Sequence, residues 1–274
     1  MDINKYRKIL AVIALCGMLN GCATFDNLLK PRVSNLVSAP DFVPEVYYQE
    51  KFLIAPAFSS YEDIEFTPSQ LRVMSNGMQG YFVKKRPGIE VIGHEICAKS
   101  LGLDQSQKLS KEFKSTGTLS DRTLEQVISK TGARYVVFSD LMDEKVDSNW
   151  NESKEGNHYN VYVSADRELT AMYTVIDTKT GQSSWSGMMK ETAYASKSYT
   201  HNGASRRSYG EATGALAVID VLLGEDPRDR YKVKEDERPY EERFPAPNPD
   251  SPAIIMAKLH QGFVLNLAKL KEEK

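Results

Sequence analysis

The N-terminal segment constrains the fold most, because it places basic residues, a short apolar run and a cysteine in that order. Three basic residues lie between positions 5 and 8, an apolar segment runs from Ile9 to Leu19, and Cys22 follows. The apolar segment is 11 residues long. That is too short for a membrane-spanning helix and is typical of a secretory signal peptide. We therefore expect residues 1–21 to be a signal peptide that contributes nothing to the folded domain.

The end of this segment, Leu19-Asn20-Gly21-Cys22, resembles a bacterial lipobox, in which a small residue precedes a cysteine that is acylated after cleavage. Asn20 stands where the lipobox usually has Ser, Ala or Thr. The resemblance implies that Cys22 carries lipid, and two or three acyl chains suffice for stable anchoring. Ala23 occupies the position where Asp would resemble an inner-membrane retention signal. In a Gram-negative source, an outer-membrane protein on the periplasmic face is therefore expected. The alternative is an ordinary signal peptide with a chance cysteine.

Composition excludes several other classes of protein. The chain is 41% hydrophobic and 26% charged, with a mean hydropathy of −0.44 and no second long apolar run. It is therefore neither wholly disordered nor a polytopic membrane protein. The net charge is −2 and no Lys/Arg-rich block occurs, so no nucleic-acid partner is expected. Cys16 is expected to leave with the signal, and Cys97 is then the single free thiol. We expect it to be a buried small side chain rather than a nucleophile.

The remaining chain predicts an α/β domain between a tether and a charged excursion. Residues 22–49, with three prolines, indicate a flexible tether after the lipidated Cys22, and 50–223 form the domain. Residues 224–250 are charged and proline-rich and predict an exposed excursion. Residues 251–274 predict a C-terminal helix that begins at Ser251-Pro252.

Within 50–223, the order of elements predicts a single domain with a mixed sheet of about five strands and flanking helices. The expected strands are 51–58 (ending at Pro56), 89–92, 134–141, 168–177 and 182–194. Helices are expected to begin at Thr67-Pro68 and at Ser120, and two more are expected to span 104–114 and 209–223. Gly181 is expected at a positive-φ position in the turn that follows Asp177. The polar segments 144–166 and 195–208 are expected to be loops.

Four segments then carry a resemblance to a known family: KFLIAPAF (51–58), GIEVI (88–92), TGARYVVFSD (131–140) and VIDTKTGQSSW (175–185). They resemble the periplasmic lipoprotein superfamily that includes the curli secretion lipoprotein and the penicillin-binding-protein activator lipoprotein. Its domain is similar to the N-terminal domain of the Tol translocation protein. The resemblance covers about residues 50–223.

The resemblance implies no catalysis, and it implies action by binding envelope partners or by forming rings. We therefore expect a non-enzymatic, lipid-anchored protein that binds a periplasmic or outer-membrane partner, as an accessory factor in assembly, secretion or cell-wall synthesis. The alternative is a ring-forming secretion-channel subunit, and an oligomer is possible in either case. The polar character of 144–166 and 195–208 disfavours a channel.

No catalytic, metal or cofactor motif is present, so no cofactor is expected beyond covalent lipid on Cys22. A lipid-anchored metal-dependent hydrolase is the rival interpretation. It would use His94 and Glu95, with His158 or His201 as further ligands, but their spacing gives no support. Candidate partner-binding residues are Tyr199, Arg206, Arg207 and Tyr209, because Tyr and Arg are favoured at protein interfaces.

Overall fold

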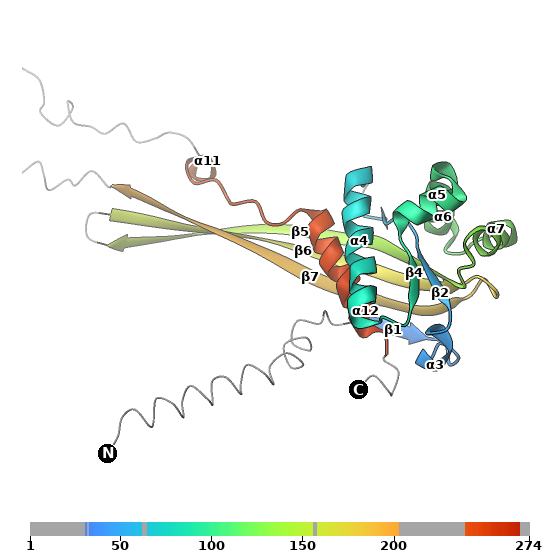
Figure 1. The fold of residues 1–274 in the computed structure, drawn as a ribbon. Helices are drawn as coiled ribbons and strands as arrows, with labels where there is room; N and C mark the ends of the chain where they lie inside the picture. The colour runs from blue at the N-terminus through green and yellow to red at the C-terminus, as the bar shows by residue number, and fades with distance from the viewer. Residues whose placement is uncertain (1–30, 32, 62–64, 156–157, 203–238, 269–274) are drawn as a thin grey trace, which may run out of the picture. The chain divides into compact units, whose positions relative to one another are not determined.

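The computed structural model describes residues 31, 33–61, 65–155, 158–202 and 239–268 (Figure 1). The chain divides into two compact units, each assembled from separate stretches of sequence. The described residues of unit 1 lie within 31–144, 169–191 and 251–268. Those of unit 2 lie within 145–168 and 192–250. Two units therefore replace the single domain that the sequence indicated.

The described residues form seven strands and a set of helices, which confirms the mixed α/β class. The strands are β1 (Val33–Ser38), β2 (Lys51–Ile54), β3 (Phe58–Ser59), β4 (Glu90–Ile92), β5 (Tyr135–Glu155), β6 (His158–Asp177) and β7 (Ser183–Asn202). The helices are α3 (Pro44–Tyr47), α4 (Pro68–Lys85), α5 (His94–Leu101), α6 (Leu103–Thr116), α7 (Asp121–Thr131), α11 (Tyr240–Arg243) and α12 (Pro252–Asn266). Seven strands exceed the expected five because β1 and β3 were not predicted.

The strand order in the sheet is β1-β7-β6-β5-β2-β4, and β3 also pairs with β5. β2 runs parallel to β4 and β5, whereas β1 is antiparallel to β7. β1 and β4 are thus the two ends of this order. Both parallel and antiparallel pairs are present, so the sheet is mixed, as the sequence predicted.

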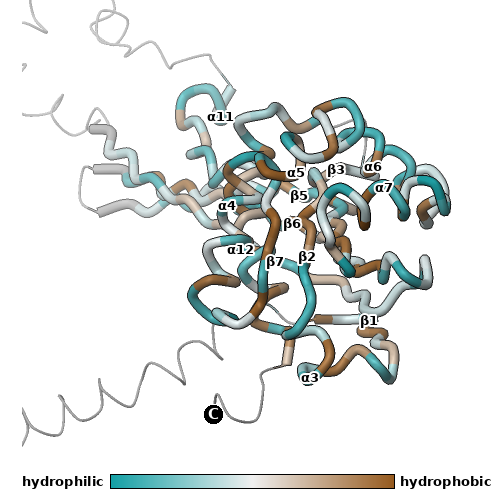
Figure 2. The backbone as a smooth tube through the Cα atoms, turned by 45° about the vertical axis from the view of Figure 1, so that its right-hand side comes forward, coloured by the Kyte–Doolittle hydropathy of each residue, from teal (hydrophilic) through white to brown (hydrophobic). Residues whose placement is uncertain are grey.

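The core of unit 1 has two parts, separated by the alternation of side chains along the strands. Val136 and Phe138 of β5 pack with Cys97, Leu109 and other side chains of α5, α6 and α7. On the opposite face of β5, the Tyr135 ring contacts the Phe52 ring, with centroids 5.0 Å apart. Further aromatic contacts lead through Phe82 of α4 to Phe263 of α12 and on to Tyr173 and Trp185. Figure 2 shows the hydrophobic colour concentrated on β2, β5 and β6, and hydrophilic stretches on the outer helices α6 and α7.

Several local predictions are confirmed. Thr67 caps α4 by accepting a hydrogen bond from the Gln70 backbone N–H at 3.3 Å, and the Gln70 side chain accepts one from the Thr67 backbone N–H at 2.8 Å. Gly132 ends α7 with φ +68°, and Gly181 lies in the β6–β7 turn with φ +70°. The C-terminal helix begins after Ser251, as expected.

The tether is the main correction. Residues 33–48 are ordered: β1 pairs with β7, α3 follows, and Phe42, Tyr47 and Tyr48 are buried. The prolines in this segment misled the prediction, because Pro44 begins a helix, where its missing N–H is harmless. Residues 22–30 lie outside the described residues.

Other expected loops are also structured. The polar segment 144–166 contains the end of β5, which runs to Glu155, and the beginning of β6, which starts at His158. The polar segment 195–208 contains the end of β7, which runs to Asn202. The described part of the 224–250 excursion contains α11 and the buried Phe244. The predicted 209–223 helix lies outside the described residues.

Smaller corrections concern helices of unit 1. The His94-Glu95 pair follows the predicted strand 89–92 and was interpreted as part of a solvated loop, but it begins α5. The apolar spacing of the helices that begin at Ser120 and Ser251 also predicts that Ile128 and Ile254 face inward, but both are exposed. In the part of the chain that the structure describes, no helix is both long and apolar enough to cross a membrane.

Candidate partner-binding surface

Unit 2 places the ends of β6 and β7 so that alternate side chains face opposite sides. Val161 and Val163 of β6 are fully buried, whereas Tyr162 between them is 47% exposed. On β7, Ala193 is buried and the adjacent Tyr194 is 80% exposed. This alternation is the period of two that a half-buried strand requires. Unit 2 therefore has a covered side and an open side.

The covered side holds an aromatic cluster, here called the unit 2 cluster. Its members are Trp150, Val161, Val163, Tyr199 and Phe244. The Trp150 indole N–H donates to the Phe244 carbonyl at 2.8 Å, and the Tyr199 hydroxyl donates to the Pro245 carbonyl at 2.6 Å. The Tyr199 and Phe244 rings meet edge to face, with centroids 5.6 Å apart. The segment 239–250 is therefore fixed against the strands by its own backbone carbonyls and one buried ring.

Two cations complete the covered side. The Arg243 guanidinium lies over the Phe244 ring at 5.2 Å, and the Lys197 ammonium lies over the Tyr199 ring at 4.7 Å. Both are cation–π contacts at ordinary distance. The Arg167 guanidinium donates to the Asp250 carbonyl at 2.7 Å, which fixes the end of the 239–250 segment.

The open side presents tyrosines among hydroxyl and amide side chains, and we call it the tyrosine face. Its members are the even-numbered residues of the two strands: Asn160, Tyr162, Ser164, Asp166, Glu168, Thr192, Tyr194, Ser196, Ser198 and Thr200. The Thr200 hydroxyl donates to the Asn160 side-chain oxygen at 2.9 Å, so the two strands point these side chains to the same side. Asp166 and Glu168 are its two charged members. Protein-binding loops of antibodies use the same combination, with tyrosines as rigid contacts and small polar residues as adaptable ones.

The structure separates the predicted partner-binding residues. Tyr199 lies on the covered side, where its ring and hydroxyl already have intramolecular contacts. Arg206, Arg207 and Tyr209 lie outside the described residues. The tyrosine face was missed although its signal was in the sequence. Tyr162 and Tyr194 alternate with buried small or branched residues, but the surrounding polar residues suggested loops.

The proposed metal ligands are not brought together among the described residues. His94 is buried at the start of α5, where its backbone N–H donates to the Ser75 hydroxyl at 2.8 Å. Burial lowers the pKa of His94, although the nearby Glu95 charge acts in the opposite direction. No group of three His, Cys, Asp or Glu side chains suited to a metal occurs in the part described. The side chains of His158 and His201 lie outside it.

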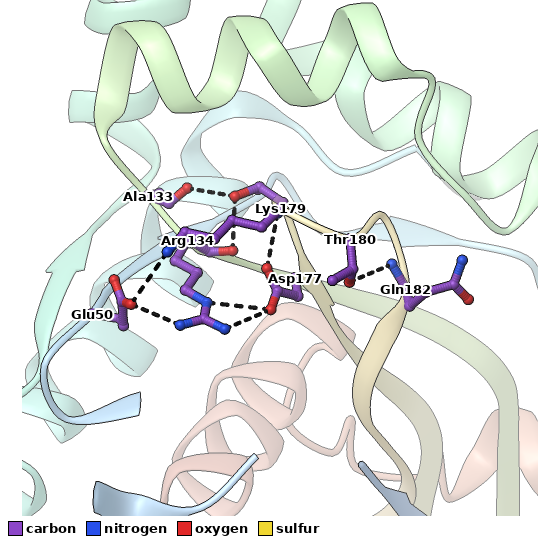
Figure 3. A network of polar contacts seen from close by, with 8 residues as sticks. Glu50, Ala133, Arg134, Asp177, Lys179, Thr180 and Gln182 are labelled. Atoms are coloured by element: carbon purple, nitrogen blue, oxygen red, sulfur yellow. Dashed lines mark hydrogen bonds and ion pairs between the residues drawn. The ribbon is translucent and has the colours of Figure 1, made fainter. Parts of the chain in front are cut away.

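The predicted turn 177–181 belongs to a polar network that joins three strands of unit 1 (Figure 3). The Arg134 guanidinium donates to the Glu50 carboxylate at 2.8 Å and to the Asp177 carboxylate at 3.1 Å. The hydrogen bond with Glu50 is the largest cause of a raised pKa of Arg134, and burial only partly opposes it. The Thr178 hydroxyl donates to the Ala133 and Arg134 carbonyls at 3.0 and 2.9 Å. All these groups satisfy one another, so the network is structural and confirms the β-turn interpretation.

Comparisons with known proteins give only weak matches. No family model matches the chain, and no curated protein matches it. Among solved structures, the PelC dodecamer from Paraburkholderia phytofirmans matches with 12% identity and a TM-score of 0.28, covering 64% of this chain and 85% of that one. The LpoB C-terminal domain from Salmonella enterica matches with 11% identity and a TM-score of 0.32, covering 54% and 87%. The lipoprotein GNA1162 from Neisseria meningitidis matches with 16% identity and a TM-score of 0.20, covering 64% and 99%. At such scores the likeness carries no argument about function.

Proposed function

We propose that this chain is a non-enzymatic, lipid-anchored protein of the bacterial cell envelope that binds a partner protein through the tyrosine face. The exposed pair Tyr162 and Tyr194, set among hydroxyl side chains, is the observation that supports binding most directly. The lipobox-like sequence that ends at Cys22 supports the anchor. In this proposal the lipid inserts into the outer membrane, and the protein lies on the periplasmic face of that membrane.

The anchor holds unit 1 close to the membrane. Pro31 already contacts the folded part: its carbonyl accepts a hydrogen bond from the Asn266 side chain at 3.2 Å. Only residues 23–30 lie between Cys22 and Pro31. Nine Cα-to-Cα steps span at most about 32 Å when fully extended. The tether is therefore much shorter than the 22–49 segment that the sequence indicated.

The tyrosine face suits a protein partner because its binding costs are low. Tyrosine has few rotatable bonds and a large contact area, so ordering it costs little conformational entropy. Tyr162 and Tyr194 already stand on paired strands rather than on loops. Asp166 and Glu168 are the two charged residues on the face, so most of the surface that binding desolvates is uncharged. The partner in this proposal is another envelope protein with a complementary surface.

The anchor is tested by replacing Cys22 with Ser in cells that produce the full-length chain. We expect uncleaved precursor without lipid, detected by mass spectrometry, and loss of the mature protein from the outer-membrane fraction. Asn20→Ser, which brings the lipobox closer to its usual form, is the control and should mature at least as well as the wild type. A Cys22→Ser protein that is cleaved normally and stays in the outer-membrane fraction would contradict the anchor.

Binding through the tyrosine face is tested with a photo-crosslinking residue at position 194 in intact cells. We expect a discrete protein adduct at this position and no such adduct from position 83, where Val83 is similarly exposed on α4. Tyr162→Ala should weaken the adduct severalfold without lowering the melting temperature, because Tyr162 lies outside the unit 2 cluster. Equal adducts from both positions, or no effect of Tyr162→Ala, would refute this role of the face.

A further inference from the structure

The first strand, β1, carries two adjacent apolar side chains that are unusually exposed. Leu36 is 57% exposed and Val37 is 66% exposed. The pairing of β1 with β7 shifts between Ser34 and Val37, and Asn35 between them has φ +53°. This irregularity lets one extra residue into β1, so that the strand does not bury both side chains against its own sheet.

The same strand lacks charged side chains, which are one of the usual protections of a sheet edge. β1 stands at one end of the strand order. Residues 33–40, VSNLVSAP, contain no charged side chain, although 26% of the whole chain is charged. Exposed edges normally carry charges that keep other surfaces away. An uncharged edge with an exposed Leu-Val pair therefore indicates that something other than water lies against it.

The position of β1 in the chain indicates which surface lies against it. Pro31 is held against α12: a Cβ added to Gly262 would come within 2.5 Å of the Pro31 ring. Leu36 follows Pro31 by five residues, and Cys22 precedes it by nine. Leu36 and Val37 are thus the exposed apolar side chains of the described residues that lie nearest in sequence to the anchor. An anchor on so short a connection keeps the bilayer at a high effective concentration around β1, so even a weak apolar contact is occupied.

We propose that Leu36 and Val37 insert into the headgroup and acyl boundary of the bilayer that holds the lipid on Cys22. The inference rests on the proposed acylation of Cys22 and adds a second, non-covalent contact to it. Two points of attachment, the lipid and the β1 edge, fix the orientation of unit 1 on the membrane. A single lipid on a tether would leave unit 1 free to rotate.

The test uses the acylated full-length mature protein in vesicles of phosphatidylethanolamine and phosphatidylglycerol. An environment-sensitive fluorophore is attached at Val37→Cys, and at Leu36→Cys in a second protein. Cys97 does not compete for the label, because it is fully buried. Val83→Cys on α4 is the matched control, since Val83 is 69% exposed. Vesicle flotation first establishes that each labelled protein is bound.

We expect blue-shifted emission at positions 36 and 37, with quenching by headgroup-proximal doxyl lipids roughly twofold or more above that at position 83. Equal quenching at 37 and 83 in protein that floats with the vesicles would overturn the membrane contact and leave the acylation intact. Protein that does not float would overturn the acylation, and this inference with it. A blue shift that depends on protein concentration but not on doxyl lipid would assign the edge to a second copy of the chain, and would also overturn it.

Discussion

His260 makes the stability of unit 1 depend on pH. This side chain of α12 is 1% exposed, and its Nδ1 lies 3.2 Å from the Tyr173 hydroxyl oxygen and also contacts the Met256 carbonyl. A carbonyl can only accept, so the contact with Met256 places the proton of the neutral ring on Nδ1. Burial lowers the pKa of His260 from 6.5 to about 4, although the Met256 carbonyl favours the charged form.

The sign and size of the effect follow from this pKa. Above pH 6.5, His260 is neutral in both the folded and the unfolded chain, so it makes no pH-dependent contribution. Between pH 6.5 and about 4 the unfolded chain takes up a proton that the folded chain refuses, so the free energy of unfolding falls as the pH falls. A drop of the pKa from 6.5 to about 4 corresponds to a total loss of about 3 kcal/mol in the free energy of unfolding.

The measurement is urea unfolding of the wild type and of His260→Asn at pH 7.5 and pH 4.5. Trp185 is a suitable probe of unit 1, because it is buried and packs against Phe263, three residues after His260. Both proteins carry Trp150→Phe, so that Trp185 is the single tryptophan of a chain that has two.

We expect the wild type to lose about 2.5 kcal/mol more than His260→Asn between the two pH values, because the full difference is reached only below pH 4. The other titrating groups, including His94 and Asp140, are common to both proteins and cancel in the comparison. An equal loss in the two proteins would show that His260 is not the group responsible, and would refute the reasoning from its burial.

Three further predictions concern single side chains. Tyr199→Ala should destabilise unit 2 by about 2 kcal/mol and Tyr199→Phe by about 1 kcal/mol, whereas Tyr194→Ala changes its stability by less than about 0.5 kcal/mol. Trp150 fluorescence during unfolding measures these changes. Equal effects of Tyr199→Ala and Tyr194→Ala would contradict the assignment of covered and open sides. Arg86→Met should lower the free energy of unfolding by about 2 kcal/mol, because the buried Arg86 guanidinium donates to carbonyls at the end of α12 that would lose their partner. An unchanged melting temperature would exclude this role. Cys97 should resist maleimide at pH 8 in the folded protein and react fully in urea, because burial raises the pKa of its thiol to about 12. Mass spectrometry counts the adducts. Rapid labelling without urea would disprove the burial.

The sequence predicted elements well where a local signal coincides with the fold. α4 is an example: Thr67, Pro68 and Gln70 mark its start, and Met74, Met78 and Phe82 recur at helical spacing and are buried. The hairpin turn is another, because Gly181 takes a positive φ that other residues adopt at a cost. Such signals depend on a few neighbouring residues, and tertiary contacts did not override them.

One helix start was located correctly for an incomplete reason. α7 begins after Ser120, as expected, but the Ser120 side chain makes no capping bond there. The Glu112 carboxylate of α6 accepts from the Ser120 backbone N–H at 2.6 Å and from the Thr123 hydroxyl at 2.7 Å instead. Partial burial alone would raise the pKa of Glu112, but these hydrogen bonds lower it overall. A cap supplied from another helix has no signature in the sequence around Ser120.

The ends of β5, β6 and β7 were not predicted because the alternation of buried side chains there is short and polar residues surround it, and the site was missed for the same reason. In unit 2 one side of the strands is polar, and part of the apolar side is completed by Phe244, which is distant in sequence from all three strands. Trp150 and Tyr199 each find a backbone carbonyl acceptor in that same distant segment. The stabilising partner is therefore non-local. A sequence window around 144–166 or 195–202 contains only half of the interaction.

The segment 33–48 was misread as a tether for a related reason, and contacts with the C-terminal part of unit 1 explain why it folds. The Tyr47 hydroxyl donates to the Ala268 carbonyl, Pro31 packs against Gly262, and Arg86 donates to Leu267. The carbonyls of Leu267 and Ala268 lie just beyond α12, where backbone carbonyls have no intrahelical partner. Tyr47 thus satisfies a carbonyl that follows α12, and Asn266 of α12 in turn holds Pro31 in place. Pro31 and the residues 33–48 therefore belong to the fold of unit 1 rather than to a spacer.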